Sequence, residues 1–124
     1  IREKIDANLS ELRRLSRDLK SPVLVVSSQN REAYKENKPP TLAALKESGG
    51  IEYSADAVIC LWRDKEESER LTEKYKRLTV RVEAHVLKNR NGELSKIKLD
   101  FTPEWSLFTE RDKEDLDYAA ALGE

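Results

Sequence analysis

Two basic side chains in the last third of the chain have the spacing of groups that act on phosphates. Lys88 and Arg90 are two residues apart, directly before the turn signal Asn91-Gly92. Because side chains two apart on a strand share one face, both cations would project together from a rigid edge. Such a pair is suited to meet a terminal phosphate and to stabilise the charge that develops during its transfer. From the residues alone, the alternative is two solvated charges beside a hairpin turn.

A local positive patch precedes a pair of glycines. Residues 31–46 carry four basic side chains against two acidic ones, on a chain whose formal net charge is −1. Lys46 is placed to meet a phosphate, and Gly49 would let main-chain amides approach one closely. Such a patch binds a nucleic-acid backbone in a salt-sensitive way that is indifferent to sequence. For Gly49 the alternative is a helix C-cap. The four basic residues are Arg31, Lys35, Lys38 and Lys46.

The composition excludes several other chemistries. One cysteine, Cys60, and one histidine, His85, rule out an internal disulfide and a Cys/His zinc cluster, and we expect no metal site within the chain. The sequence has no phosphate-binding loop, no dinucleotide fingerprint and no Gly-x-Ser-x-Gly elbow. His85 lies within an alternating segment, which favours a hydrogen-bonded sheet residue over a catalyst.

The overall composition indicates a folded domain with a polar surface. Hydrophobic and charged residues each make up 38% of the 124 residues, which excludes a generally basic nucleic-acid binder. No apolar run is long enough to span a membrane and no signal peptide opens the chain, so we expect a reducing, cytoplasmic setting and no membrane partner. Because the sequence contains no methionine and begins inside a predicted helix, we expect a piece of a longer protein.

The first half of the chain predicts helices around one buried strand. Apolar residues at offsets of three and four over residues 3–20 predict an amphipathic helix, which Ser21-Pro22 ends. The continuous apolar run 23–26 is typical of a strand buried on both faces in a parallel sheet. Residues 30–41 read as a loop, followed by a short helix over 42–48 that stops at Gly49-Gly50.

The second half predicts strands and a hairpin. Residues 57–62 predict a strand, and the charged stretch 63–77 an exposed helix or a mobile insertion. Residues 78–88 alternate, which places their even-numbered apolar residues inside and residues 79, 81, 83 and 85 outside. Asn91-Gly92 predicts a tight turn into a strand over 97–101. A short strand over 105–108 and a helix over 112–122 are expected after it. These elements predict an α/β fold whose sheet turns antiparallel at one edge.

Three blocks together resemble the C-terminal half of the RecA-like motor domain of DnaB-type replicative helicases. They are SPVLVVSSQNR at 21–31, LAALKESGGIEYSAD at 42–56 running into AVICLWRD, and VLKNRNG at 86–92. Their order and spacing match that family over residues 1–108, whereas the acidic tail 109–124 lies outside the resemblance. The fold that it implies is a partial RecA-like core, with a mostly parallel sheet and a C-terminal antiparallel hairpin.

The resemblance implies roles for individual residues. In the family, ATP binds between neighbouring copies of a six-membered ring, and a basic finger reaches in from one copy. The finger would be Arg90 with Lys88, acting in trans. Arg63 and Phe101 would stack on the two faces of the nucleotide base. The channel loop that holds single-stranded DNA would contain Lys46, Glu47 and Gly49, with Arg31 nearby; Phe101 could equally be a core residue.

The chain departs from the family pattern at one position. Family members carry a glutamine directly after the serine that ends the buried strand, where it senses the terminal phosphate. Here Ser28 occupies that place and Gln29 follows one residue later. A shift of one residue turns a strand side chain to the opposite face, so the sensor is either Gln29 swinging back or the Ser28 hydroxyl.

The same resemblance implies what the chain lacks. The phosphate loop, the metal-binding acid and the catalytic glutamate would all lie upstream of Ile1, so ATP and Mg²⁺ are cofactors of the full-length protein, and neither is expected to bind this chain tightly. We therefore expect no ATPase activity from the 124 residues alone. The implied partners are single-stranded DNA, further copies in a hexameric ring, and a helicase loader or a primase.

Two other readings stay open at this point. A non-catalytic, helicase-derived module that docks on a motor ring or on DNA would fit the displaced Gln29 and the charged 63–77 segment. A RecA-like ATPase of recombination or clock type is the third reading. A phosphate loop in the residues encoded before Ile1 would favour the motor over the module.

Overall fold

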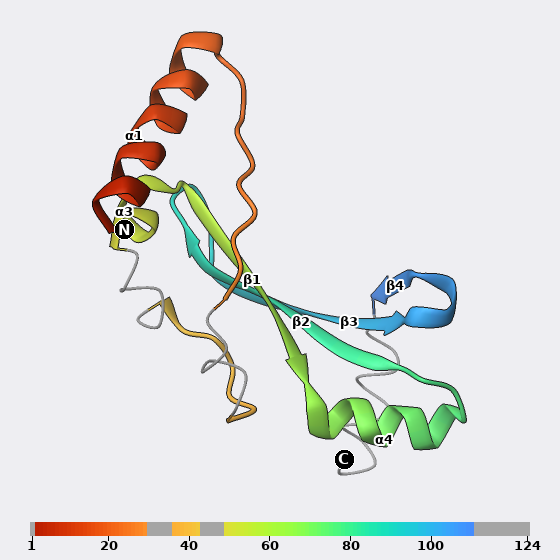
Figure 1. The fold of residues 1–124 in the computed structure, drawn as a ribbon. Coiled ribbons are helices and arrows are strands. Elements are labelled where there is room, and N and C mark those ends of the chain that lie inside the picture. Colours follow the sequence, from red (N-terminus) through yellow and green to blue (C-terminus); the bar gives the residue numbers. More distant parts are fainter. Residues whose placement is uncertain (1, 30–35, 43–48, 111–124) are drawn as a thin grey trace. The chain divides into compact units, whose positions relative to one another are not determined.

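A computed structural model of the chain describes residues 2–29, 36–42 and 49–110. The described part falls into two compact units, one within residues 1–59 and 86–94 and the other within residues 60–85 and 95–124. The predicted helix over 112–122 lies outside the described residues. The elements in chain order are α1 (Arg2–Leu19), α3 (Gly49–Ser54), β1 (Ala57–Asp64), α4 (Lys65–Tyr75), β2 (Val80–Asn89), β3 (Ser95–Thr102), the 3-10 turn η2 (Pro103–Trp105) and β4 (Leu107–Glu110) (Figure 1).

The strands form one sheet in the order β1-β2-β3-β4. β3 and β4 are antiparallel, with Phe101 opposite Phe108. β2 and β3 are neighbours joined by a short loop, which makes them a hairpin. The Arg90 amide donates to the Asp56 carbonyl oxygen over 2.9 Å, so the end of β2 meets the start of β1 and this pair is antiparallel too. The C-terminal antiparallel hairpin is therefore confirmed, whereas a parallel pairing is not found among the described strands.

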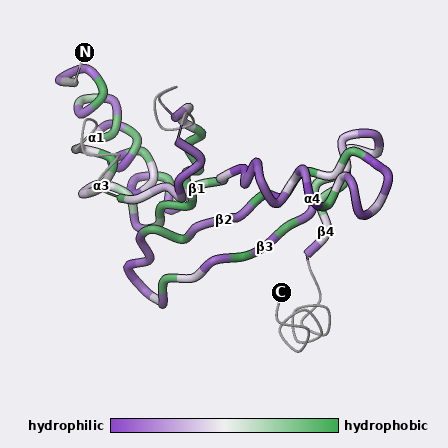
Figure 2. The backbone as a smooth tube through the Cα atoms, turned by 90° about the horizontal axis from the view of Figure 1, so that it is seen from below, coloured by the Kyte–Doolittle hydropathy of each residue, from purple (hydrophilic) through white to green (hydrophobic). Residues whose placement is uncertain are grey.

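Helix α1 matches its prediction closely. It runs over Arg2–Leu19, and hydrophobic and hydrophilic residues alternate along it (Figure 2). Lys20 then adopts a left-handed conformation with φ of 50°, and the Ser16 hydroxyl donates to the Ser21 carbonyl oxygen over 2.7 Å. Because Pro22 follows and disfavours helical geometry at the residue before it, the helix cannot continue.

The predicted helix over 42–48 lies outside the described residues except for Leu42, and the expected helix stop at Gly49-Gly50 is wrong, because these two glycines are the first residues of α3. Gly50 lies against α1, where an added Cβ atom would have to displace the Asp6 carboxylate and would come within 3.1 Å of Leu9 Cδ1. The absence of a side chain at Gly50 therefore serves the close approach of two helices rather than a left-handed turn.

The expected buried strand at 23–26 is not found among the described residues. No strand is assigned to residues 21–29, and Leu24 and Val26 are 93% and 92% exposed. A strand needs a neighbour for its main-chain hydrogen bonds and a covering layer for its side chains. In the part of the chain that the structure describes, this segment is not paired as a strand, and Leu24 and Val26 are not covered.

The buried core of the described residues lies within residues 60–85. Its apolar members are Cys60, Trp62, Leu71, Val80 and Ala84. The charged segment 63–77 contributes to it, because α4 is a helix whose Ser68 and Leu71 are buried while most of its other residues are exposed.

Helix α4 begins with a side-chain cap. The Asp64 carboxylate accepts a hydrogen bond from the Glu67 amide over 3.1 Å. The prediction of an exposed helix over 63–77 is thus confirmed for α4, apart from the two residues that it buries.

Strand β2 confirms the predicted strand but not its predicted polar face. Thr79, Arg81 and His85 are 5%, 2% and 3% exposed, although the alternation placed them outside. Partners for their polar atoms explain this: the Arg81 amide donates to the Ser68 hydroxyl over 2.8 Å, and the Arg81 guanidinium pairs with Asp100. A helix and a neighbouring strand supply these partners, and neither can be inferred from a period-two pattern.

The last strand begins later than predicted. β4 covers Leu107–Glu110, while Trp105 belongs to the preceding 3-10 turn. Ser106 is left-handed with φ of 48° and closes that turn, so Trp105 cannot share the strand geometry of Leu107.

Candidate functional site

The loop between β2 and β3 places the two candidate cations differently from the expectation. β2 ends at Asn89, and the Gly92 amide donates to the Asn89 carbonyl oxygen over 3.4 Å, so the turn is centred on Arg90 and Asn91. Lys88 is thus a strand residue and Arg90 a turn residue. The prediction that both residues belong to one strand is wrong, because the chain turns one residue earlier than the Asn-Gly signal indicates.

Arg90 is exposed and paired with a carboxylate that the sequence analysis did not single out. Its Nη1 lies 2.5 Å from Asp56 Oδ1, with the Arg90 and Asp56 side chains 42% and 74% exposed. An ion pair this exposed contributes about 0–1 kcal/mol. The guanidinium has further N–H donors besides the one that Asp56 uses, and a polyphosphate offers several oxygens that could accept from them.

The place of Asp56 in the sequence, relative to the two predicted strands, could have indicated it as the partner of Arg90. It is the residue directly before β1, and Arg90 directly follows β2, so pairing of the two strands brings them together. The signal is weak because it requires the antiparallel pairing of two strands that are separated by a helix.

Lys88 is half-buried and engaged in an interaction within the structure. The Asn89 amide nitrogen Nδ2 donates to the Glu93 carbonyl oxygen over 3.2 Å and fixes the loop that follows. Of the two candidate cations, Arg90 is therefore the more accessible one, and it is presented by a loop held by main-chain and side-chain hydrogen bonds.

The two candidate base-stacking residues extend from β1 and β3, the strands on either side of β2. Arg63 is exposed and follows Trp62, which is buried on the opposite side of β1. Phe101 is half-buried, and its ring stacks on Phe108 with the centroids 4.4 Å apart and the planes at 27°.

The spacing of these strands bears on the stacking hypothesis. β1 and β3 are two strand spacings apart, which amounts to about 10 Å. A base held between two stacking partners needs roughly 7 Å between them, so this separation leaves room for one. Phe108 already covers one face of Phe101, so only the other face could meet a base. Phe101 thus packs against a neighbouring ring, as expected of a core residue, and is also partly exposed, as a base-stacking residue must be.

The candidate phosphate sensors lie in the segment after α1. Ser28 is exposed and Gln29 is half-buried, with Gln29 engaged in an interaction within the structure. Residues 21–29 are not assigned to a strand, so the rule that a one-residue shift turns a strand side chain to the opposite face does not apply to Ser28 and Gln29 in this structure. The choice between Ser28 and Gln29 stays a prediction.

Most of the candidate DNA loop lies outside the described residues. This applies to Arg31, Lys46 and Glu47, while Gly49 begins α3. Lys38 is described, and its ammonium lies 2.9 Å from the Glu36 carboxylate. Their hydrogen bond lowers the pKa of Glu36 and raises the pKa of Lys38, so both stay charged at neutral pH and this part of the patch is locally neutralised.

The described residues do not assemble a metal site. Among residues 2–29, 36–42 and 49–110, no group of three His, Cys, Asp or Glu side chains could hold a metal ion. His85 is a hydrogen-bonded sheet residue, as predicted: its Nε2 lies 3.0 Å from Glu83 Oε1, and its ring meets Trp62 edge-on at 5.9 Å. Burial raises the pKa of the Cys60 thiol, which disfavours the reactive thiolate.

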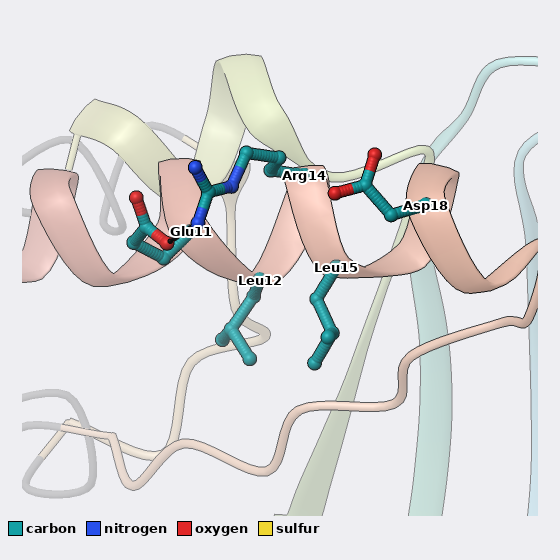
Figure 3. Close-up of a pocket in the computed structure, with 5 residues that line it drawn as sticks. All are labelled: Glu11, Leu12, Arg14, Leu15 and Asp18. Carbon is teal, nitrogen blue, oxygen red and sulfur yellow. Dashed lines mark hydrogen bonds and ion pairs between the residues drawn. The ribbon is translucent and has the colours of Figure 1, made fainter.

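Helix α1 carries a surface depression that contains none of the candidate site residues. Its lining comes from α1 alone, and within it Arg14 Nη2 lies 2.9 Å from Glu11 Oε2 (Figure 3). Leu12 and Leu15 point away from that ion pair. None of the described helices is long and apolar enough to cross a membrane.

Comparison with known proteins matches residues 2–110 to the DnaB-like helicase C terminal domain. The chain is 34% identical over 98 residues to the replicative DNA helicase DnaB of Buchnera aphidicola subsp. Baizongia pistaciae, covering 78% of this chain and 20% of that protein. It is 31% identical over 106 residues to the DnaB of Treponema pallidum, covering 86% and 21%.

A third relative is the replicative DNA helicase DnaC of Bacillus subtilis, 33% identical over 99 residues, which cover 79% of this chain and 21% of that protein. The chain thus spans about a fifth of the length of the curated relatives that it matches.

Proposed function

Because the chain belongs to the DnaB-like helicase C-terminal domain family, we propose that it forms part of the motor of an ATP-dependent replicative DNA helicase. In this proposal ATP hydrolysis drives translocation on single-stranded DNA, and the chain supplies a finger to the nucleotide of a neighbouring copy. The observation that carries the proposal is the exposed Arg90 in a fixed loop at the end of β2.

Arg90 would stabilise charge rather than make or break bonds. Phosphoryl transfer spreads negative charge over the oxygens of the transferred group, and a guanidinium placed against them lowers the barrier. Lys88, one strand residue before the loop, would support the same phosphates. We propose that the ligands of Mg²⁺ belong to the rest of the full-length protein, since the chain spans about a fifth of the length of its relatives.

The nucleotide base and the terminal phosphate would be read by other residues. We propose that Arg63 and the face of Phe101 that Phe108 does not cover stack on the base, and that Ser28 or Gln29 senses the terminal phosphate. Arg31, Lys46, Glu47 and Gly49 would form the loop that holds single-stranded DNA. A hexameric ring, a loader or a primase would be the further partners.

The exposed apolar segment 23–26 supports the proposal of a larger core. Leu24 and Val26 are more than nine-tenths exposed, whereas Leu and Val side chains of folded domains are most often buried. Since the chain spans about a fifth of its relatives, we propose that this segment joins a parallel sheet whose other strands belong to the rest of the motor domain.

The charged segment 63–77 gives less support to the alternative of a docking module. α4 buries Ser68 and Leu71, is capped by Asp64, and accepts a hydrogen bond from the Arg81 amide of β2 at the Ser68 hydroxyl, so it is part of the core of its own unit. One of the two features that motivated the alternative thereby has a structural explanation.

The test is the Arg90→Ala variant of the full-length protein, compared with Arg14→Ala. Arg14 is also an exposed arginine in an ion pair, but it lies on α1. We expect Arg90→Ala to lower DNA-stimulated ATP turnover by roughly 10³-fold or more while nucleotide binding is retained, as for arginine fingers in other NTPases. Turnover at the wild-type rate in Arg90→Ala would remove Arg90 from the mechanism.

A further inference from the structure

A single residue holds both the main chain and the side chain of Arg90. The Arg90 amide donates to the Asp56 carbonyl oxygen over 2.9 Å, and Arg90 Nη1 donates to Asp56 Oδ1 over 2.5 Å. The two residues are 34 apart in sequence and belong to the same compact unit. The main-chain hydrogen bond fixes the position of the Arg90 backbone, and the side-chain hydrogen bond fixes the direction of its guanidinium.

The pair leaves the guanidinium able to bind something else. A guanidinium carries five N–H donors in one plane, and the bond to Asp56 uses Nη1. With the Arg90 side chain 42% exposed, part of this fork faces solvent. A carboxylate on one edge of the fork sets the orientation of its plane, while the other edges can donate to phosphate oxygens.

The pair has little value for stability alone, because both partners are exposed. Its geometric effect is larger, since Asp56 replaces free rotation of a long side chain by one orientation. Displacing a catalytic group by about 1 Å can cost about 100-fold in rate.

We propose that Asp56 is a positioning residue that orients the Arg90 guanidinium toward a triphosphate bound by a neighbouring copy. This inference rests on the proposed function of Arg90. Asp56 touches no substrate in this scheme, so its whole effect passes through Arg90.

The experiment measures kcat and KM for DNA-stimulated ATP hydrolysis by the full-length protein. Asp56→Asn keeps the main-chain bond and the side-chain shape but removes the charge. We expect it to lower kcat by roughly 10- to 100-fold with KM for ATP changed by less than about twofold. Asp56→Glu, which keeps the charge on a longer arm, should recover part of the loss.

Glu11→Gln is the matched control, because Glu11 also forms an exposed carboxylate–arginine pair in the same unit, with Arg14. It should leave kcat unchanged. Asp56→Asn is also combined with Arg90→Lys, which keeps a charge but loses the fork. If Asp56 acts through Arg90, the double variant should have the kcat of Arg90→Lys alone within about twofold.

The outcomes separate the two proposals. Wild-type kcat in Asp56→Asn and Asp56→Glu, with turnover lost in Arg90→Ala, overturns the positioning role and leaves the function of Arg90 standing. An equal loss from Asp56→Asn in the wild-type and Arg90→Lys backgrounds also overturns it, because Asp56 would then act independently. Wild-type turnover in Arg90→Ala overturns the proposed function itself.

Discussion

The guanidinium of Arg81 lies 2.7 Å from the carboxylate of Asp100, and the two side chains are 2% and 18% exposed. Arg81 also donates from its main-chain amide to the Ser68 hydroxyl on α4. One residue of β2 is thereby joined to β3 and to α4. The unit built from residues 60–85 and 95–124 therefore depends on a buried charge that is stable only while its partner is present.

Removing one partner of this pair should strongly destabilise the protein. We expect Asp100→Ala to lower the free energy of unfolding by about 3–5 kcal/mol, because it leaves the Arg81 charge buried and uncompensated. Urea denaturation of the chain measures this. Glu11→Ala, which removes an exposed ion pair, should cost less than about 1 kcal/mol. Equal losses in both variants would contradict a special role for the buried pair.

The exposed segment 23–26 gives a test of the proposed larger core. Leu24→Ser with Val26→Ser should change the free energy of unfolding of the 124-residue chain by less than about 0.5 kcal/mol, because both side chains are exposed. In the full-length protein the same pair should cost about 3 kcal/mol or more, since burial of each side chain is worth roughly 1.5–3 kcal/mol.

Leu71→Ala is the matched comparison for that test. Leu71 is 1% exposed, so its truncation should cost about 2–5 kcal/mol in both proteins. If the paired serine substitutions are equally mild in the full-length protein, segment 23–26 does not join a buried sheet.

Cys60 should make stability depend on pH in the alkaline range. Burial raises the thiol pKa in the folded state, so the folded protein holds this proton more tightly than the unfolded chain. The resulting stabilisation is fully present below the unfolded pKa of about 8.5 and is lost as pH rises through the folded pKa. Relative to Cys60→Ala, the wild-type free energy of unfolding should fall by up to about 1.4 kcal/mol per pH unit above pH 8.5. A constant difference from pH 7 to pH 10 would contradict this.

The proposed stacking roles of Arg63 and Phe101 predict a selective loss of nucleotide affinity. Arg63→Ala and Phe101→Leu should each raise KM for ATP by roughly 10-fold in the full-length protein, because stacking on a base is worth about 1–3 kcal/mol. Inorganic tripolyphosphate has no base, so its competition with ATP at the site should keep the wild-type inhibition constant. Equal weakening of ATP and tripolyphosphate would indicate a structural effect of these side chains instead.

Predictions that rest on neighbouring residues in the sequence agree with the structure, and those that depend on distant contacts do not. α1, β1, β2 and the hairpin were predicted because helical spacing, apolar runs, alternation and turn residues are local. The helix stop at Gly49-Gly50 failed because the same residue type serves both a left-handed turn and a close helix contact. The positions of Asp6 and Leu9 on α1 distinguish these two uses of Gly50.

The sequence by itself determined the local elements, the three blocks that identify the helicase family, and Arg90 as the candidate finger. Only the tertiary structure decided that Arg81 and His85 are buried, that the turn is centred on Arg90 and Asn91, and that Asp56 holds the arginine. The physical reason is that burial and ion pairing depend on neighbours far along the chain. A strand pattern specifies which side chains share a face, while the helix or strand that covers that face decides which of them meet water.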